Sequence, residues 1–125
     1  MDVRPIAGDD GAGGSGPLSV IRSDGSAEPA HDPGLPPGQL AELVAAMVRA
    51  RVVDERLAAW GEAGRLGFLP PGRGREAAVI GATAALGADD WLFPTGADWA
   101  AALARGLSLE TFVQRVVGGT DDPLE

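Results

Sequence analysis

The sequence predicts a mainly α-helical protein with about four helices after a flexible N-terminal arm. The first 38 residues hold 8 of the 19 glycines and 6 of the 10 prolines. Few large apolar residues accompany them, so burial cannot offset the entropy of ordering this stretch. Beyond it, apolar residues recur at helical spacing and glycines follow as helix stops. We expect an arm at 1–38, a helical domain at 39–119 and a tail at 120–125.

The arm contains a short extended piece, predicted at 18–25. Leu18 and Val20 favour extended backbone, and Ser23-Asp24-Gly25 is a turn sequence. A stiff, proline-rich connector follows in "AEPAHDPGLPPG". It carries the single histidine, His31, which we interpret as a solvated linker residue rather than a catalytic one.

The first helix is predicted from Gln39 to about Ala63, with prolines just before it, where proline is tolerated. Apolar residues at three-four spacing form one face: Leu43, Ala46, Ala50, Val53, Leu57 and Trp60. Others widen the apolar surface beyond that face: Leu40, Val44, Met47 and Val48. The helix is therefore too long, and apolar over too much of its circumference, to be covered by the rest of this chain.

The second helix is predicted from Arg75 to Leu86, with Glu76 in its first turn and Gly87 just past its end. Apart from Thr83, its residues after Glu76 are apolar and mostly small. Such a helix packs closely on every side, as in the middle of a larger body.

A turn and a short extended piece in "GADDWLFP" then lead to two more helices. The third is predicted in "ADWAAALARG", with Asp98 in its first turn and Gly106 at its end. The fourth is predicted in "SLETFVQRVVGG", with Ser108 as its N-cap and two glycines as its stop.

Composition excludes several classes of function. The net charge is −8 and no basic run is present, which argues against nucleic-acid and anionic-membrane partners. The sequence has no apolar stretch of bilayer-spanning length and no signal-peptide pattern at its start, so we predict a cytoplasmic protein.

The sequence lacks cysteine and lysine, which excludes thiol nucleophiles, thiolate zinc sites and Schiff bases. A catalytic serine triad needs a histidine, and the single histidine is His31, which we interpret as a linker residue.

The turn "PGRGREAAVIG" raises the question of phosphate binding. Gly72-x-Gly74-x-x-Ala77 fits the looser form of the dinucleotide fingerprint. That motif must follow a buried strand directly, but prolines stand where the strand would end, and no second strand-helix unit follows. The P-loop lysine is also missing. We therefore predict a glycine-rich loop leading into a packed helix, with Arg73 and Arg75 as solvated or partner-facing charges.

An ordered series of motifs resembles the N-terminal region of the alpha subunit of thiamine-diphosphate-dependent 2-oxo acid dehydrogenases, of the pyruvate and branched-chain type. Arg51 with Asp54 and Glu55 is similar to the family's R-x-x-D-E helix. "EAGRLGF", "GREAAVIGATAAL", "DDWLFP" and "LARGLSLETFVQRVVGG" follow in the family's order, and "SDG" resembles the arm of branched-chain members. The resemblance covers about Leu18 to Pro123 and implies helices that flank a thiamine-binding α/β domain.

Two departures from the family pattern concern the cofactor. A Tyr-Arg pair grips the cofactor's diphosphate in that family, whereas the matching positions here are Gly96 and Ala97. The sequence also ends at Glu125, before the family's G-D-G metal motif and catalytic histidine loop. We interpret two pairs of adjacent acids as turn formers rather than metal ligands: Asp89-Asp90 and Asp121-Asp122. We expect no catalytic, metal or cofactor-binding residue in this chain, although the family uses thiamine diphosphate and magnesium.

Three functional hypotheses remain from the sequence. The first is an N-terminal fragment or truncated relative of the alpha subunit, inactive on its own; the family's chemistry is oxidative decarboxylation of a 2-oxo acid with acyl transfer to lipoamide. The second is a non-catalytic helical interaction module that binds a 2-oxo acid dehydrogenase subunit through apolar helix faces. The third is an unrelated small helical protein whose motif order is a coincidence.

Overall fold

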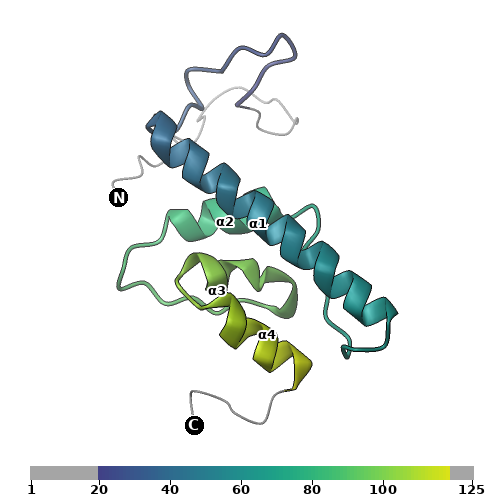
Figure 1. Ribbon diagram of the computed structural model, residues 1–125. Coiled ribbons are helices and arrows are strands. Elements are labelled where there is room, and N and C mark those ends of the chain that lie inside the picture. The colour runs from purple at the N-terminus through teal and green to yellow at the C-terminus, as the bar shows by residue number, and fades with distance from the viewer. Residues whose placement is uncertain (1–19, 119–125) are drawn as a thin grey trace. The chain divides into compact units, whose positions relative to one another are not determined.

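The computed structural model describes residues 20–118. The chain divides into two compact units, Met1–Leu40 and Ala41–Glu125. Four α-helices and one 3-10 turn follow one another in the described residues. The α-helices are labelled in Figure 1. The prediction of a mainly helical protein with about four helices is confirmed. No helix of the described part combines the length and the apolar character needed to cross a bilayer.

In the N-terminal unit, residues 20–28 form a tight turn between two short extended pieces. Ile21 and Ala27 pair as an isolated antiparallel bridge, and Gly25 between them has a positive φ of 83°. Asp24 stabilises the turn because its Oδ1 accepts from the Ser26 amide at 2.9 Å and from the Ser26 hydroxyl at 2.6 Å. The expected extended piece at 18–25 therefore ends in the turn at Asp24-Gly25, while Leu18 lies outside the described residues.

Helix α1 spans Pro37–Glu62, so it begins two residues before the predicted Gln39 and ends one before Ala63. Pro37 is its first residue, where the missing amide hydrogen has no helical partner to lose. Its buried residues, at a spacing of four and three, are Ala50, Asp54 and Leu57. Three valines at a spacing of four residues form an apolar ridge on another side of α1. Each is 52–60% exposed in the described structure: Val44, Val48 and Val52.

Helix α2 spans Glu76–Ala84 and packs against α3. Its predicted end at Leu86 with Gly87 as the stop is wrong, because the helix ends at Ala84 and its C-cap, Ala85, is right-handed. The Gly87 amide instead donates to Asp90 Oδ2 at 2.7 Å, in the following turn. Only Ile80 and Thr83 of α2 are buried in the described structure, which leaves its small residues uncovered there.

The third predicted helix is divided into two parts. A 3-10 turn, η1, spans Gly96–Asp98, and α3 spans Ala100–Ala104, so Asp98 lies before α3 rather than in its first turn. The turn forms because the Thr95 hydroxyl donates to Asp98 Oδ2 at 2.5 Å and the Asp98 amide donates to the Thr95 carbonyl at 2.9 Å. Gly106 follows α3 with a φ of 100°.

Helix α4 spans Leu109–Val117, with the predicted signals at both ends. Ser108 is the N-cap, and its Oγ accepts from the Thr111 amide at 3.0 Å. Gly118 is the C-cap in the left-handed conformation, with a φ of 79° that favours glycine.

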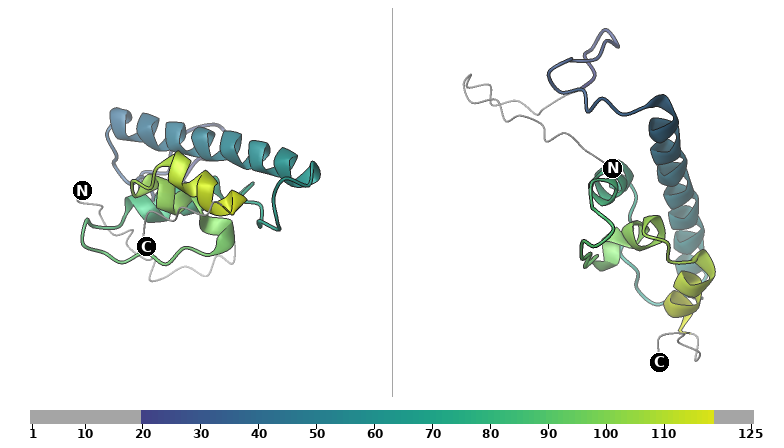
Figure 2. Two further views of the ribbon diagram at one scale, coloured as in Figure 1. Left: turned by 60° about the horizontal axis from the view of Figure 1, so that its bottom comes forward. Right: turned by 90° about the vertical axis from the view of Figure 1, so that its left-hand side faces the viewer.

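The core of the second unit gathers where α1, α2, α3 and α4 meet. Figure 2, left panel, shows α2, α3 and α4 on one side of α1. The buried apolar cluster comprises Ala50, Leu57, Ile80, Trp99, Ala100 and Phe112. The Trp99 and Phe112 rings stack with centroids 5.0 Å apart, so the end of η1 and α4 share one aromatic contact.

Candidate functional site

The candidate site is the glycine turn at 72–76, which enters α2. Gly74 has a φ of 86°, and the Arg75 amide donates to the Gly72 carbonyl at 3.1 Å, which closes the turn. Both glycine amides donate to carboxylates of this chain. The Gly72 amide is 2.7 Å from Asp54 Oδ1, and the Gly74 amide is 2.9 Å from Glu76 Oε2.

The two arginines next to the turn form ion pairs with acids of the same chain. Arg51 Nε donates to Glu76 Oε1 at 2.6 Å, which joins α1 to the start of α2. Arg75 Nη2 donates to Asp98 Oδ1 at 2.7 Å, which joins the turn to η1. The expectation that Arg75 is a solvated or partner-facing charge is therefore wrong in part, because its head is half-exposed but paired with Asp98.

These contacts lower the pKa values of the two acids, Glu76 and Asp98. The hydrogen bond from Arg51, with help from backbone amides and the Arg51 charge, lowers the pKa of Glu76 to about 2. The hydrogen bond from Thr95, together with the nearby Arg75 charge, lowers the pKa of Asp98 below its usual value. Both carboxylates are therefore ionised at neutral pH, as ion-pair partners must be.

The free energy of unfolding is expected to decrease in acid because protonation of Glu76 breaks its ion pair with Arg51. A carboxylate with a depressed pKa in the folded state stabilises the fold fully above its unfolded value, and this contribution is lost as the pH falls through the folded value. For Glu76 this window runs from about pH 4.5 down to about pH 2. The urea midpoint of the wild type should decrease across it, and the Glu76→Gln variant should show a smaller decrease. An equal decrease in both proteins would contradict the role of the Arg51 pair.

Asp54 and Trp99 meet behind the turn. Asp54 is 7% exposed and Trp99 is 5% exposed. The buried Trp99 Nε1 has no hydrogen-bond acceptor among the described residues. A methyl carbon built on Gly72 would lie 3.3 Å from Trp99 Nε1 and 3.4 Å from Asp54 Oδ1. A cavity of about 10 Å³ lies here, lined by these residues together with Arg75 and Glu76, among others.

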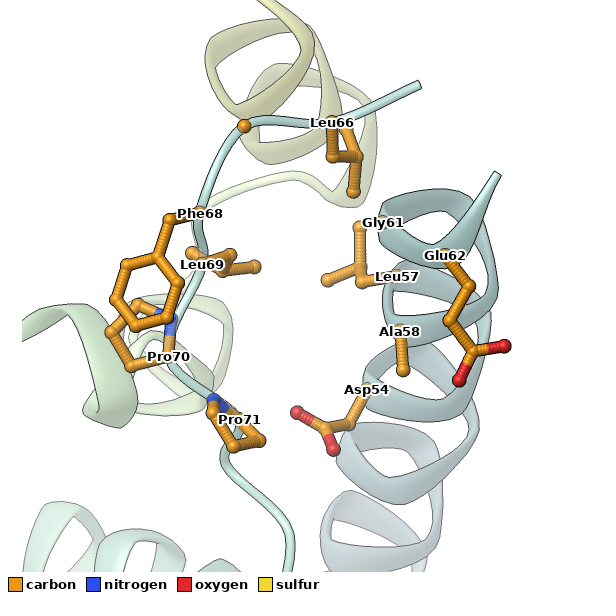
Figure 3. Close-up of a pocket in the computed structure, with 11 residues that line it drawn as sticks. Asp54, Leu57, Ala58, Gly61, Glu62, Leu66, Phe68, Leu69, Pro70 and Pro71 are labelled. Atoms are coloured by element: carbon orange, nitrogen blue, oxygen red, sulfur yellow. The ribbon is translucent and has the colours of Figure 1, made fainter. Parts of the chain in front are cut away.

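A larger pocket of about 480 Å³ lies between α1 and the segment that leads to the turn (Figure 3). In Figure 3 the Asp54 carboxylate points into the gap toward Pro71. The other lining residues are Leu57, Ala58, Gly61, Glu62, Leu66, Gly67, Phe68, Leu69, Pro70 and Pro71. The lining contains no histidine, serine, threonine or arginine, so it offers carboxylates and apolar surface but no hydroxyl, imidazole or cation.

Gly96 and Ala97, which the resemblance aligns with the family's Tyr-Arg pair, lie beside this turn. Gly96 and Ala97 begin η1, and a methyl carbon built on Gly96 would lie 3.4 Å from the Pro70 ring. The Ala97 carbonyl oxygen would lie 3.4 Å from a methyl carbon built on Gly72. Neither residue has a side-chain donor, and Arg75 is held by Asp98. These residues do not fit a diphosphate held by a tyrosine and an arginine.

The remaining candidate residues are the acidic pairs and His31, and the structure places those that it describes in turns. The described residues contain no group of three or more histidine, cysteine or acidic residues that could hold a metal. Asp90 accepts from the Gly87 amide, while Asp121 and Asp122 lie outside the described residues. His31, expected to be a solvated linker residue, is half-buried, and its amide donates to the Glu28 carbonyl.

Sequence reasoning missed Asp54 and Trp99 as central residues of the site. The sequence analysis places Asp54 only in a family motif, although it stands four residues after Ala50 and three before Leu57, on the buried face of α1. That spacing was the available signal for a buried carboxylate. Trp99 had no such signal, because its environment depends on where η1 turns against the glycine loop.

Comparison with known proteins identifies a family. Residues 44–125 match the model of the dehydrogenase E1 component. The chain is 36% identical over 93 residues to the 3-methyl-2-oxobutanoate dehydrogenase subunit alpha of Mycobacterium tuberculosis, covering 73% of this chain and 25% of that protein. It is 39% identical over 77 residues to the pyruvate dehydrogenase E1 component subunit alpha of Bacillus cereus, covering 62% of this chain and 21% of that protein.

The chain spans a quarter or less of the length of these curated relatives. No solved structure matches it. The family match covers the glycine turn, η1 and all of α2 to α4, and it agrees with the ordered motifs of the sequence. This chain belongs to the dehydrogenase E1 component family.

Proposed function

We propose that this chain forms the N-terminal helical part of the alpha subunit of a thiamine-diphosphate-dependent 2-oxo acid dehydrogenase. The observation that carries the proposal is the family match over residues 44–125, with relatives named for pyruvate and for 3-methyl-2-oxobutanoate. The reaction assigned to the whole subunit is oxidative decarboxylation of such a 2-oxo acid. Within it, residues 41–118 supply a helical scaffold around the glycine turn.

The chain by itself is proposed to be inactive and to bind neither the cofactor nor magnesium. Gly96 and Ala97 offer no side-chain donor to a diphosphate, and the guanidinium groups of Arg51 and Arg75 are paired with acids. The pockets beside Asp54 contain no general base poised against a nucleophile.

A turnover assay tests this proposal. The purified 125-residue protein is mixed with thiamine diphosphate, magnesium and either pyruvate or 3-methyl-2-oxobutanoate, and reduction of an artificial electron acceptor is followed. We expect no rate above the protein-free blank, while a complete pyruvate dehydrogenase E1 component provides the positive control. Turnover with either substrate would overturn the proposed inactivity. Calorimetry with thiamine diphosphate and magnesium should likewise show no saturable heat.

A second candidate function is a non-catalytic module that binds a 2-oxo acid dehydrogenase subunit. The observation that favours it is exposed apolar surface on α1, the ridge of Val44, Val48 and Val52. Beside this ridge lies an apolar groove of about 430 Å³ in which Arg49 is the one charged lining residue. Lining residues from the other helices and the loop after α3 include Ile80, Leu103, Leu107 and Leu109.

Co-purification with such a subunit at fixed stoichiometry would support the interaction module. The Val48→Glu variant should then lose the partner, because it places a charge on the ridge without touching the buried face of α1. Glu55→Ala is a control on the same helix at an exposed position. A stable monomer that retains no such subunit would count against this function. The cytoplasmic location stays a prediction from the sequence.

A further inference from the structure

The glycine turn gathers the donors that an anion site uses. Two backbone amides, those of Gly72 and Gly74, and two guanidinium groups, those of Arg51 and Arg75, lie at the entrance to α2. Turns of successive amides that open a helix bind phosphate groups in many proteins, because the amides and the helix dipole both favour negative charge. In this chain each of the four donors is bonded to a carboxylate of the chain itself.

Glu76 is coordinated as a bound anion would be. Its Oε1 accepts from Arg51 Nε at 2.6 Å, and its Oε2 accepts from the Gly74 amide at 2.9 Å. It is the first residue of the nine-residue α2, and its side chain is only 12% exposed. A phosphate oxygen at this turn would require the same amide and the same guanidinium.

We infer that the Glu76 carboxylate is a built-in anion that occupies this glycine turn and excludes phosphate-bearing ligands from it. The carboxylate is tethered next to its donors, so it binds them without the entropy cost that a free ligand pays. The neighbouring carboxylate of Asp54 on the Gly72 amide adds repulsion against a second anion. A phosphate would have to displace Glu76 from both Arg51 and Gly74.

Trp99 supplies an independent observation at the same place. Its indole Nε1 is a buried donor with no acceptor in the described structure, and it lines the small cavity together with Gly72, Arg75 and Glu76. The turn therefore has more donors than its own carboxylates use. The cavity of about 10 Å³ has room for no group larger than a water molecule, so a phosphate does not fit against this donor in the structure.

Titration with inorganic pyrophosphate tests the inference in the full 125-residue chain. Binding is followed by calorimetry and by the amide resonances of Gly72 and Gly74. The wild type should show no saturable change at either amide. Glu76→Gln keeps an oxygen that can accept from Gly74 but loses the charge, so it should bind pyrophosphate saturably, with a shift at Gly74 and an affinity at least tenfold above the detection limit that the wild type sets.

Glu62→Gln is the matched control, because it changes the net charge equally at an exposed position of α1. Equal binding by Glu76→Gln and Glu62→Gln would overturn the inference, since the gain would then be a general charge effect. Saturable shifts at Gly72 or Gly74 in the wild type would also overturn it, and this arm needs no variant to fold. Neither result depends on turnover of a 2-oxo acid, so the inference and the proposed function fail independently.

Discussion

Replacing Phe112 with alanine is expected to lower the free energy of unfolding by about 3–5 kcal/mol, the range for a buried aromatic residue truncated in a packed core. Phe112 is 7% exposed, and its ring stacks on Trp99. The truncation removes this contact and leaves a cavity between α4 and η1. Because few other large side chains are buried in the described residues, the loss is a large share of the stability of so small a domain.

Urea unfolding followed by circular dichroism at the helix band measures this effect. Val117→Ala is the control, since it truncates an exposed residue of the same helix and should change the stability by no more than about 0.5 kcal/mol. Phe112→Leu should fall between the two proteins because it fills part of the cavity. A Phe112→Ala protein as stable as the Val117→Ala protein would mean that α4 does not pack on Trp99 in solution.

Replacing Asp54 with alanine is expected to destabilise the fold by about 1.5–3 kcal/mol, the cost of losing a hydrogen bond to a charged group and leaving its donor unpaired. The Gly72 amide, 2.7 Å from Asp54 Oδ1, would lose its acceptor. This bond also ties the glycine turn to α1. We therefore expect the Gly72 amide hydrogen to exchange with solvent faster in the variant, in addition to a lower urea midpoint.

Two controls separate the hydrogen bond from other effects. Asp54→Asn keeps an oxygen for the Gly72 amide, so it should retain more of the stability than Asp54→Ala does. Glu55→Ala removes an acid from the next, exposed position of α1 and should have little effect. If Asp54→Ala and Glu55→Ala unfold at the same urea concentration, the buried carboxylate does not hold the turn.

Local signals were sufficient for the helices whose ends are set by neighbouring residues. Ser108 and Gly118 cap α4 as predicted, because an N-cap hydroxyl and a left-handed glycine act within one turn of the chain. The predicted end of α2 was wrong because the helix stops at Ala84 with a right-handed C-cap, and the Gly87 amide instead donates to Asp90 Oδ2 in the following turn. The third helix was divided because Thr95 and Asp98 form their own turn before Trp99.

The sequence by itself determined the helical class, the approximate position of each helix, the over-apolar surface of α1 and the membership of the E1 family. These properties are encoded in residue spacing along one segment and in the order of short motifs. The tertiary structure alone decided the polar contacts of the site, which join residues 18, 25 and 23 positions apart: Asp54 with Gly72, Arg51 with Glu76 and Arg75 with Asp98. Helical periodicity assigns a face to each acid and each arginine, but it does not fix which loop lies against that face. The pairs follow from the packing of α1 against the turn and of the turn against η1, because a hydrogen bond forms only where folding brings donor and acceptor within about 3 Å.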